Sequence, residues 1–117
     1  MTQGRAPKRL RDAYGACQEI EAFTTNRSFL DYETDRGLRL VVERLFEILG
    51  EALNRASRDD SSLNELIPDL RKVVGVRNII AHGYDIIRDE VIWDIAVNEV
   101  PVLQEQIGRV LVARGWE

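Results

Sequence analysis

The sequence predicts an all-α fold, a four- to five-helix antiparallel bundle that is expected to dimerise. Apolar residues recur at spacings of three and four along most of the 117 residues, as in helices with one buried face. No segment shows the alternation of polar and apolar residues that marks a strand. The connections between the apolar stripes are short, as in a helical bundle. This length suits one hydrophobic core, so we expect a single domain over residues 1–117, with residues 1–7 flexible.

Two helices are predicted in the first half of the chain. The first ends near residues 26–28, because short polar side chains there compete for backbone hydrogen bonds. The second covers roughly residues 34–58 and is followed by a polar linker at residues 58–62. The apolar stripes are Leu10, Tyr14, Cys17, Ile20 and Thr24 in the first helix and Leu38, Val42, Leu45, Leu49, Leu53 and Ala56 in the second.

Two further helices are predicted in the second half. Pro68 fits the first turn of the third helix, where its missing N–H does no harm, and Gly83 suits the C-terminal end of that helix. The fourth covers roughly residues 89–114, and Pro101 inside it should kink it or split it in two. The apolar stripes are Leu70, Val73, Val74, Ile80 and Ala81 in the third helix and Ile92, Ile95, Val100, Leu103, Ile107, Val110 and Leu111 in the fourth.

The chain contains one cysteine, Cys17, and one histidine, His82, which excludes several kinds of site. This count allows neither an internal disulfide nor a Cys/His zinc site. Acidic residues do not occur at the spacing of an EF-hand or a two-metal site, so we expect no metal and no cofactor. A catalytic triad or a Cys–His pair could use only His82. Cys17 lies on an apolar stripe and is predicted to be a small core residue.

Charge and hydropathy predict where the protein acts. No stretch approaches the roughly 18 apolar residues that cross a bilayer, and no apolar core follows the basic residues near the N-terminus. We therefore expect a cytoplasmic protein with neither a signal peptide nor a membrane contact. The net charge of −4 does not favour broad, non-specific binding of nucleic acid, so any contact with RNA must be local.

Arg77 falls on the predicted packing face of the third helix, where apolar residues are expected. A charged guanidinium on that face is costly unless it is paired or lies at an interface. One interpretation is a structural arginine that pairs with a carboxylate, and the other is an arginine that binds phosphate or stabilises a transition state. Arg71 and Lys72 precede it, and no acid occurs before Tyr84, which predicts a local patch of charge +3.

His82 follows Arg77 by five residues, which on one ideal helix separates the two side chains by about 140°. They can act together only if the helix unwinds at Gly83 or if a second copy of the chain completes the site. Asn78 lies four residues before His82 on the same face and could fix its tautomer. A structural histidine remains the alternative.

Two weaker groups of candidates remain. Glu43, Glu47 and Glu51 form an acidic stripe on the second helix, and this stripe is predicted to be solvated. The alternative is that Glu51 pairs with Arg77 or contacts a partner. Trp93 and Trp116 could stack on bases, but Trp93 lies in an apolar segment and is predicted to be a core or interface residue.

The segment from Arg77 to Tyr84 reads R-x4-H-x-Y and resembles the signature of HepT toxins in the HEPN superfamily. HepT is the toxin half of MntA/HepT toxin–antitoxin modules. Further similar segments occur in matching order: ILGEA at 48–52, IP at 67–68, VIW at 91–93 and VPVL at 100–103. The likeness covers about residues 10–111. Gly83 departs from the family pattern, because an aspartate is common at this position in relatives.

The resemblance implies a HEPN-like helical bundle that forms a homodimer, with arginine and histidine from both subunits in one cleft. It implies a metal-independent endoribonuclease in which Arg77 and His82 are catalytic and Asn78 orients the phosphate of the RNA substrate. It also implies a type VII toxin–antitoxin system, in which an MntA-type nucleotidyltransferase antitoxin inactivates the toxin by transferring AMP to Tyr84.

Two other interpretations stay open beside the toxin. One is a non-catalytic HEPN subunit that binds a nucleotidyltransferase, which the acidic net charge and the Gly83 departure favour. The other is a purely structural helical dimer, which requires Arg77 to be neutralised by a carboxylate of its own subunit and buried away from His82.

Overall fold

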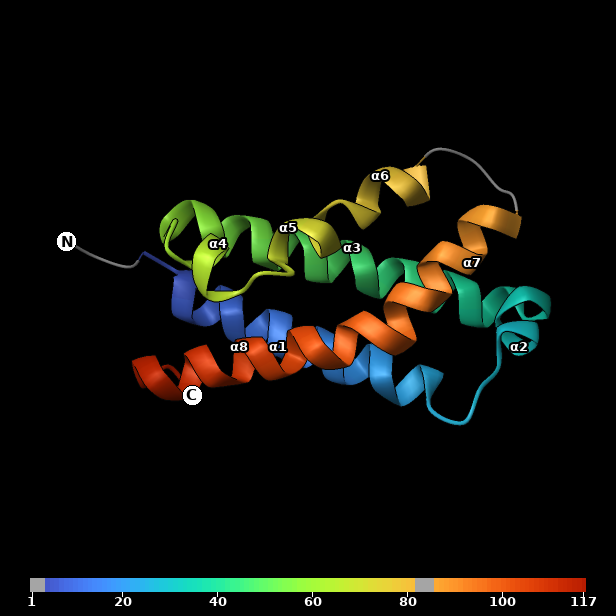
Figure 1. Ribbon diagram of the computed structural model, residues 1–117, viewed down its shortest axis with the longest axis horizontal. Coiled ribbons are helices and arrows are strands. Elements are labelled where there is room, and N and C mark those ends of the chain that lie inside the picture. The colour runs from blue at the N-terminus through green and yellow to red at the C-terminus, as the bar shows by residue number, and fades with distance from the viewer. Residues whose placement is uncertain (1–3, 82–85) are drawn as a thin grey trace.

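The computed structural model describes residues 4–81 and 86–117, and Figure 1 shows them as helices stacked along one long axis. The described residues contain no strand, so the predicted all-α fold is confirmed. None of their helices is long and apolar enough to cross a membrane. In chain order the elements are α1 (Ala6–Thr24), α2 (Phe29–Thr34), α3 (Arg36–Asp59), α4 (Leu63–Leu66), α5 (Leu70–Val74), α6 (Val76–Ala81), α7 (Ile86–Asp94), the π-helical segment η1 (Ile95–Glu99) and α8 (Val100–Arg114).

The helices form four arms, and successive arms run in opposite directions along the bundle. α1 leads away from the N-terminal end, α3 returns, α5 and α6 lead away again, and α7, η1 and α8 return (Figure 1). The start of α1 and the end of α8 therefore lie at the same end of the molecule. α3 contacts α1 on one side and α5 and α6 on the other, so it is the helix against which the candidate site is built.

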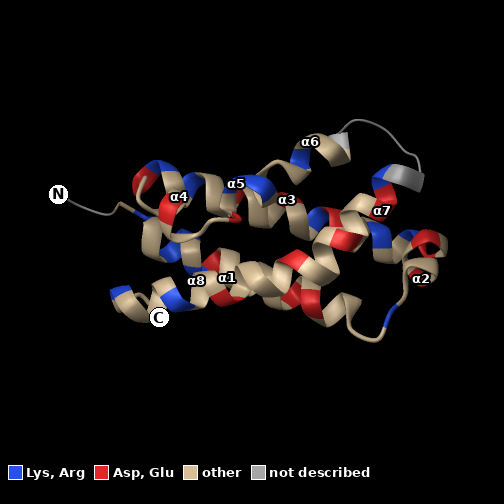
Figure 2. Cartoon of the chain, viewed as in Figure 1, with Lys and Arg blue, Asp and Glu red and all other residues tan. Residues whose placement is uncertain are grey.

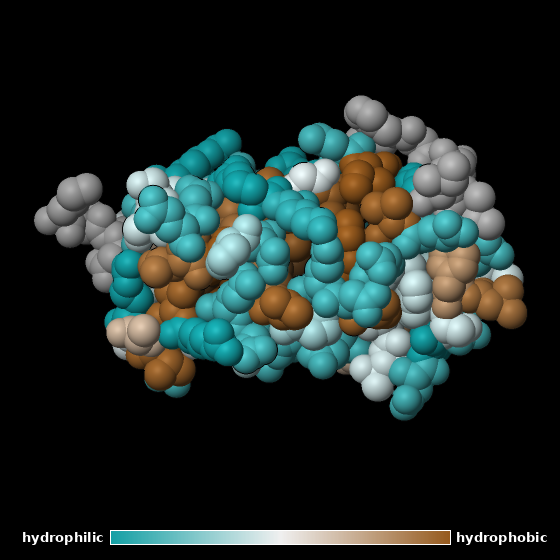
Figure 3. Space-filling model, viewed as in Figure 1, coloured by the Kyte–Doolittle hydropathy of each residue, from teal (hydrophilic) through white to brown (hydrophobic). Residues whose placement is uncertain are grey.

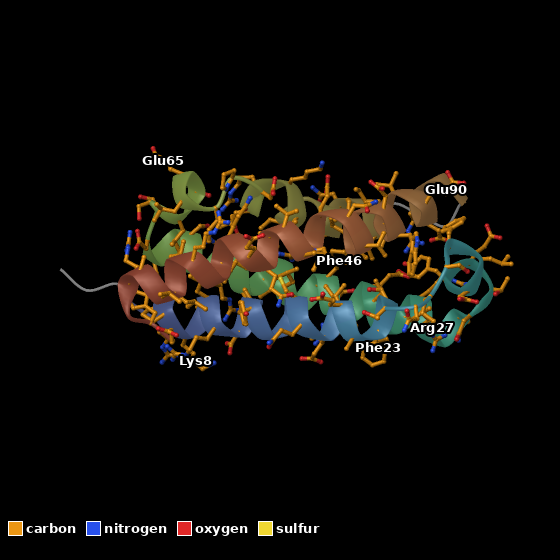
Figure 4. The ribbon with its side chains drawn as sticks, turned by 60° about the horizontal axis from the view of Figure 1, so that its bottom comes forward. Lys8, Phe23, Arg27, Phe46, Glu65 and Glu90 are labelled. Carbon is orange, nitrogen blue, oxygen red and sulfur yellow. The ribbon has the colours of Figure 1, made fainter. Side chains whose placement is uncertain are left out.

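One cluster of buried side chains joins the four arms. The apolar stripes predicted for the first two helices are buried, apart from Tyr14, which is half-buried. The seven apolar residues predicted for the fourth helix are all buried as well. Phe46 of α3 points between the helices, whereas Phe23 of α1 points away from the bundle (Figure 4). The helical periodicity therefore predicted the core of these arms correctly.

The third arm consists of two short helices instead of one. α5 ends at Val74, α6 begins at Val76, and the residue between them is Gly75, whose backbone freedom weakens a helix. The prediction that Pro68 lies in the first turn of a helix was wrong, because α4 ends before it and α5 begins after it, at Leu70. Ile67 has φ −123° and ψ 85°, outside the helical region that a following proline disfavours, and α4 stops there. The predicted end at Gly83 lies outside the described residues.

The fourth arm is interrupted, as the proline predicts, but the interruption precedes the proline. The N–H of Val100 donates to the carbonyl of Ile95, one residue further back than in an α-helix. Pro101 has no N–H to give to the carbonyl four residues before it, and the wider turn lies where that bond is missing. After Arg114 the arm ends on Gly115 in the left-handed conformation (φ 66°), which is the predicted end.

α2 is a helix that the apolar periodicity does not reveal, because six residues are too few to show a stripe. A capping box begins it: the N–H of Asp31 donates to the Ser28 hydroxyl at 3.1 Å, and the N–H of Ser28 donates to the Asp31 carboxylate at 2.9 Å. At the N-terminus, α1 starts on buried Ala6, inside the range predicted to be flexible. Residues 1–3 of that range lie outside the described residues.

Candidate functional site

Arg77 lies on α6 with its side chain 48% exposed, so the prediction that it occupies the packing face was wrong. The reason is the interruption at Gly75. Leu70, Val73 and Val76 are buried at a spacing of three, and Val76 takes the inward position that the regular helical spacing assigns to residue 77. Arg77 is therefore available to a ligand, which a core arginine would not be.

The aliphatic part of Arg77 lies across α3 at Gly50. A Cβ atom added at Gly50 would stand 3.3 Å from both Cγ and Cδ of Arg77. Because glycine has no Cβ, the arginine stem can lie close to the α3 backbone. The glycine of the ILGEA segment is thus explained by the close approach of α6 to α3.

The guanidinium of Arg77 is paired with the next residue of α3. Its Nη1 atom lies 3.3 Å from Oε2 of Glu51, while Nε of Arg55 donates to Oε1 of the same carboxylate. The interpretation that Glu51 pairs with Arg77 is confirmed. The purely structural interpretation requires Arg77 to be buried in such a pair, and the observed pair is half-exposed.

A shallow hollow surrounds this pair, and we call it the arginine hollow. It is lined by Arg44, Glu47, Glu51 and Arg55 of α3 and by Arg77 and Ile80 of α6. Three arginines against two glutamates give the arginine hollow a net charge of +1, in a chain whose net charge is −4. Figure 2 shows basic and acidic residues interspersed along the helices, and hydrophilic residues cover most of the same side of the molecule, with smaller hydrophobic areas between them (Figure 3).

The predicted patch of charge +3 on the third arm is wrong, because other arms supply acids to it. Lys72 pairs with Glu99 of η1, and Arg77 pairs with Glu51. Arg71 donates instead to neutral oxygens on Asn64, Asn54 and Ser57, which join α5 to α4 and α3. Contacts between helices far apart in sequence thus remove most of the charge excess that the local sequence suggests.

The remaining predicted site residues are placed only in part. Asn78 is exposed on α6, next to Arg77, and its backbone N–H donates to the carbonyl of Gly75 at 3.1 Å. His82 and Tyr84 lie outside the described residues, so their predicted roles and the predicted contact between Asn78 and His82 stay predictions. The structure therefore brings Arg77 and Asn78 to one exposed end of the third arm.

Comparison with known proteins identifies the family. The model of the family described as HepT-like ribonucleases matches residues 14–110, from α1 to α8 and including the whole R-x4-H-x-Y pattern. The chain belongs to the HepT-like ribonuclease family. The predicted resemblance is thereby confirmed over most of its length.

Individual members of the HepT-like family agree with this assignment. A Thermococcus cleftensis protein named "Probable ribonuclease HepT" is 30% identical over 95 residues, which cover 81% of this chain and 86% of that protein. A Methanocaldococcus jannaschii protein with RNase in its name is 27% identical over 100 residues, covering 84% of this chain and 89% of the relative. No solved structure matches the chain significantly.

The HepT-like chain also contains a buried ion-pair cluster that was not predicted from the sequence. Arg88 of α7 donates to the carboxylate of Glu43 and, at 2.8 Å, to that of Asp89. The side chains of Arg88 and Glu43 are only 5% and 11% exposed, so the prediction that Glu43 belongs to a solvated stripe was wrong. One signal was available: Arg88 precedes Ile92 by four residues and so shares the buried face of its helix.

This cluster fixes the start of α7 on α3, as the Glu51–Arg77 pair fixes α6 on α3. Tyr32 of α2 is completely buried beside the cluster. Burial, reinforced by the charges of Glu43 and Asp89, raises the pKa of Tyr32 well above its usual value. α3 therefore pairs with both helices that flank residues 82–85, with α6 before them and with α7 after them.

The other sequence candidates are core residues. Cys17 is buried, and burial together with the charge of Glu21 raises the pKa of its thiol to about 12. Trp93 is half-buried against Tyr32, with 5.3 Å between the ring centroids, and Trp116 is buried. The predictions that Cys17 and Trp93 pack in the core are confirmed. Among the described residues no group of three histidine, cysteine or acidic side chains could hold a metal ion.

Proposed function

We propose that this HepT-like protein is a metal-independent endoribonuclease and the cytoplasmic toxin of a type VII toxin–antitoxin pair. The observation that carries the proposal is the state of Arg77. It opens the R-x4-H-x-Y pattern, it is half-exposed, and its guanidinium is held over a hollow of net positive charge. An arginine presented in this way is suited to a phosphate group of RNA.

The proposed reaction is transesterification within the RNA chain. The 2′-oxygen of a ribose attacks the adjacent phosphorus, and the bond from phosphorus to the 5′-oxygen of the next nucleotide breaks. His82 takes the proton from the 2′-hydroxyl or donates one to the leaving 5′-oxygen. Arg77 stabilises the negative charge on the pentavalent phosphorus, and Asn78 orients the phosphate. The products are a 2′,3′-cyclic phosphate and a 5′-hydroxyl, and DNA resists cleavage because it lacks the 2′-hydroxyl.

The same mechanism leads us to propose a homodimer. One proton leaves the 2′-hydroxyl and another reaches the 5′-oxygen, whereas each chain has a single histidine. Two copies of the chain that share one cleft supply two histidines and two copies of Arg77. Analytical ultracentrifugation of the purified protein tests this proposal, and a monomer that cleaves RNA contradicts it.

Tyr84 is the proposed point of control. An MntA-type nucleotidyltransferase antitoxin transfers the AMP group of ATP to the Tyr84 hydroxyl, which forms a phosphodiester and releases pyrophosphate. The added anion and nucleoside fill the space in front of Arg77 and compensate its charge, so RNA no longer binds. Mass spectrometry of the protein after co-expression with the antitoxin locates the modification, and an unmodified Tyr84 beside an active antitoxin contradicts it.

The nuclease proposal is tested with purified protein and single-stranded RNA in the presence of EDTA. Wild-type protein is expected to cleave the RNA but not DNA of the same sequence. His82→Ala is expected to abolish cleavage, and Arg77→Ala is expected to lower kcat about a hundredfold, as the loss of an oxyanion donor typically does. Circular dichroism confirms that each variant is folded. Cleavage that persists in folded His82→Ala removes the proposed base.

One observation favours the alternative, a non-catalytic HEPN subunit that binds a nucleotidyltransferase. Glu51 already neutralises Arg77, and the arginine hollow retains a net charge of only +1. Expression in bacteria separates the two functions. The toxin arrests growth by itself and is relieved by the antitoxin, whereas a binding subunit is harmless when expressed alone.

A further inference from the structure

Glu51 is the carboxylate of the arginine hollow that touches Arg77. We propose that Glu51 is a positioning residue, which orients the Arg77 guanidinium for the reacting phosphate and weakens the binding of the RNA ground state. This inference rests on the proposed nuclease function and names a residue outside the R-x4-H-x-Y pattern. Glu51 itself need not contact the RNA, because it acts through Arg77.

The carboxylate of Glu51 is well placed to hold a flexible partner. Its Oε1 atom accepts from Nε of Arg55, one turn later on the same helix, while Oε2 faces Nη1 of Arg77 at 3.3 Å. Arg55 thereby fixes the rotamer of Glu51 on the 24-residue helix α3. A carboxylate restrained in this way cannot follow Arg77, so it defines one position for the guanidinium.

Arg77 has a second point of support in the stem contact at Gly50. A Cβ atom added at position 50 would lie 3.3 Å from both its Cγ and its Cδ atom. The stem and one end of the guanidinium are therefore located by two adjacent residues of α3. A long side chain held at two points loses most of its rotamers before substrate arrives, which is what preorganised catalysis requires.

The contact leaves Arg77 able to bind phosphate. A guanidinium has five N–H donors, and only Nη1 contacts Glu51. The side chain remains 48% exposed, so the other donors can reach a ligand. The negative charge of Glu51 opposes a bound phosphodiester, which carries one negative charge. The pentavalent transition state carries additional negative charge, so Glu51 opposes it as well. The benefit of Glu51 to catalysis therefore lies in holding the Arg77 guanidinium in the reacting position.

Glu47 provides a matched control for a test of Glu51. It lies one turn earlier on α3, lines the same hollow, is 47% exposed against 43% for Glu51, and also makes a 3.3 Å ion pair. Its partner, however, is Arg44 and not Arg77. Glu47→Gln and Glu51→Gln therefore make the same change of charge in the arginine hollow, but only Glu51→Gln releases Arg77.

The experiment measures kcat and KM for single-stranded RNA with wild-type protein and both variants. Both substitutions are expected to lower KM about threefold, because each removes one negative charge near the phosphate. Only Glu51→Gln is expected to lower kcat, by about fivefold, which is the upper range for one exposed ion pair. A lower kcat together with a lower KM is not expected from a residue that only supports the fold. An unchanged kcat in Glu51→Gln, or an equal loss in Glu47→Gln, overturns the proposal.

A second measurement does not depend on cleavage. In ¹⁵N NMR spectra, the Nε–Hε signal of Arg77 is expected to show restricted motion in wild-type protein and Glu47→Gln but free motion in Glu51→Gln. Equal mobility in all three proteins overturns the positioning role of Glu51. If wild-type protein does not cleave RNA but the mobility differs as expected, the nuclease proposal fails and the Glu51–Arg77 contact stands.

Discussion

The buried ion pair between Glu43 of α3 and Arg88 of α7 gives the strongest prediction for stability. Both side chains are almost completely removed from water, at 11% and 5% exposure, so neither charge can be solvated if its partner is lost. The test is Glu43→Gln, which keeps the shape of the side chain and removes its charge. Among the described residues, Asp89 then still pairs with Arg88, and its carboxylate is 2.8 Å away and 16% exposed.

The expected loss follows from these contacts. Removing one partner of a buried pair typically costs about 3–5 kcal/mol, and the remaining contact with Asp89 places Glu43→Gln at the lower end, at about 3 kcal/mol. For a chain of this size that corresponds to a fall in Tm of about 12 °C. Glu47→Gln, one turn later on the same helix but half-exposed, is expected to change the free energy of unfolding by less than about 0.5 kcal/mol.

The assay is urea and thermal denaturation followed by circular dichroism at neutral pH. The double variant Glu43→Leu/Arg88→Met is added, because an apolar pair of similar volume replaces a buried ion pair at little or no cost in stability. It is expected to be more stable than Glu43→Gln. A loss below about 1 kcal/mol in Glu43→Gln, or a double variant no more stable than that single one, refutes the conclusion that desolvated charge decides stability here.

Four further predictions concern the core and the cap of α2. Cys17 is expected to resist iodoacetamide at pH 8 in the folded protein, because its thiol is buried with a pKa raised to about 12, and to react in urea; rapid modification of folded protein contradicts this. Leu103→Ala is expected to cost about 3 kcal/mol in urea denaturation, because Leu103 is completely buried. Ser28→Ala is expected to cost about 1 kcal/mol through the lost cap of α2. Hydrogen bonds with Ser28 lower the pKa of Asp31 below 3.8 in the folded protein. The stabilisation by Asp31 is therefore complete above pH 3.8 and is lost as the pH falls through the lowered pKa of the folded state. Denaturation of wild-type protein and Asp31→Asn at about pH 6 and at low pH checks this.

Most of the fold could be predicted because a long amphipathic helix repeats its signal many times. The stripes of α1, α3 and the fourth arm each span several turns, and nearly all of their members are buried. Short elements give weaker signals. α2 depends on one capping box, and the third arm depends on Gly75 and Pro68, whose effects cannot be separated by periodicity over so few residues.

The candidate site could likewise be predicted from the sequence only in part. The R-x4-H-x-Y pattern predicted Arg77 as a site residue, with Asn78 beside it, and their roles stay predictions. The partners of Arg77 could be suggested only as alternatives, because Glu51 precedes it by 26 residues. The pairing of Glu43 with Arg88 spans 45 residues and was not foreseen.

By itself, the sequence determined the helical class, the buried faces of the long helices, the family and the exclusion of an internal disulfide and of a Cys/His zinc site within one chain. Only the tertiary structure decided that Arg77 faces outward, that Glu43 is buried and that acids from other helices offset the basic residues of the third arm. The physical reason is one of range. Helical periodicity is a local property of the chain, whereas the state of a charged side chain depends on the charges and the solvent that packing brings to it from distant helices.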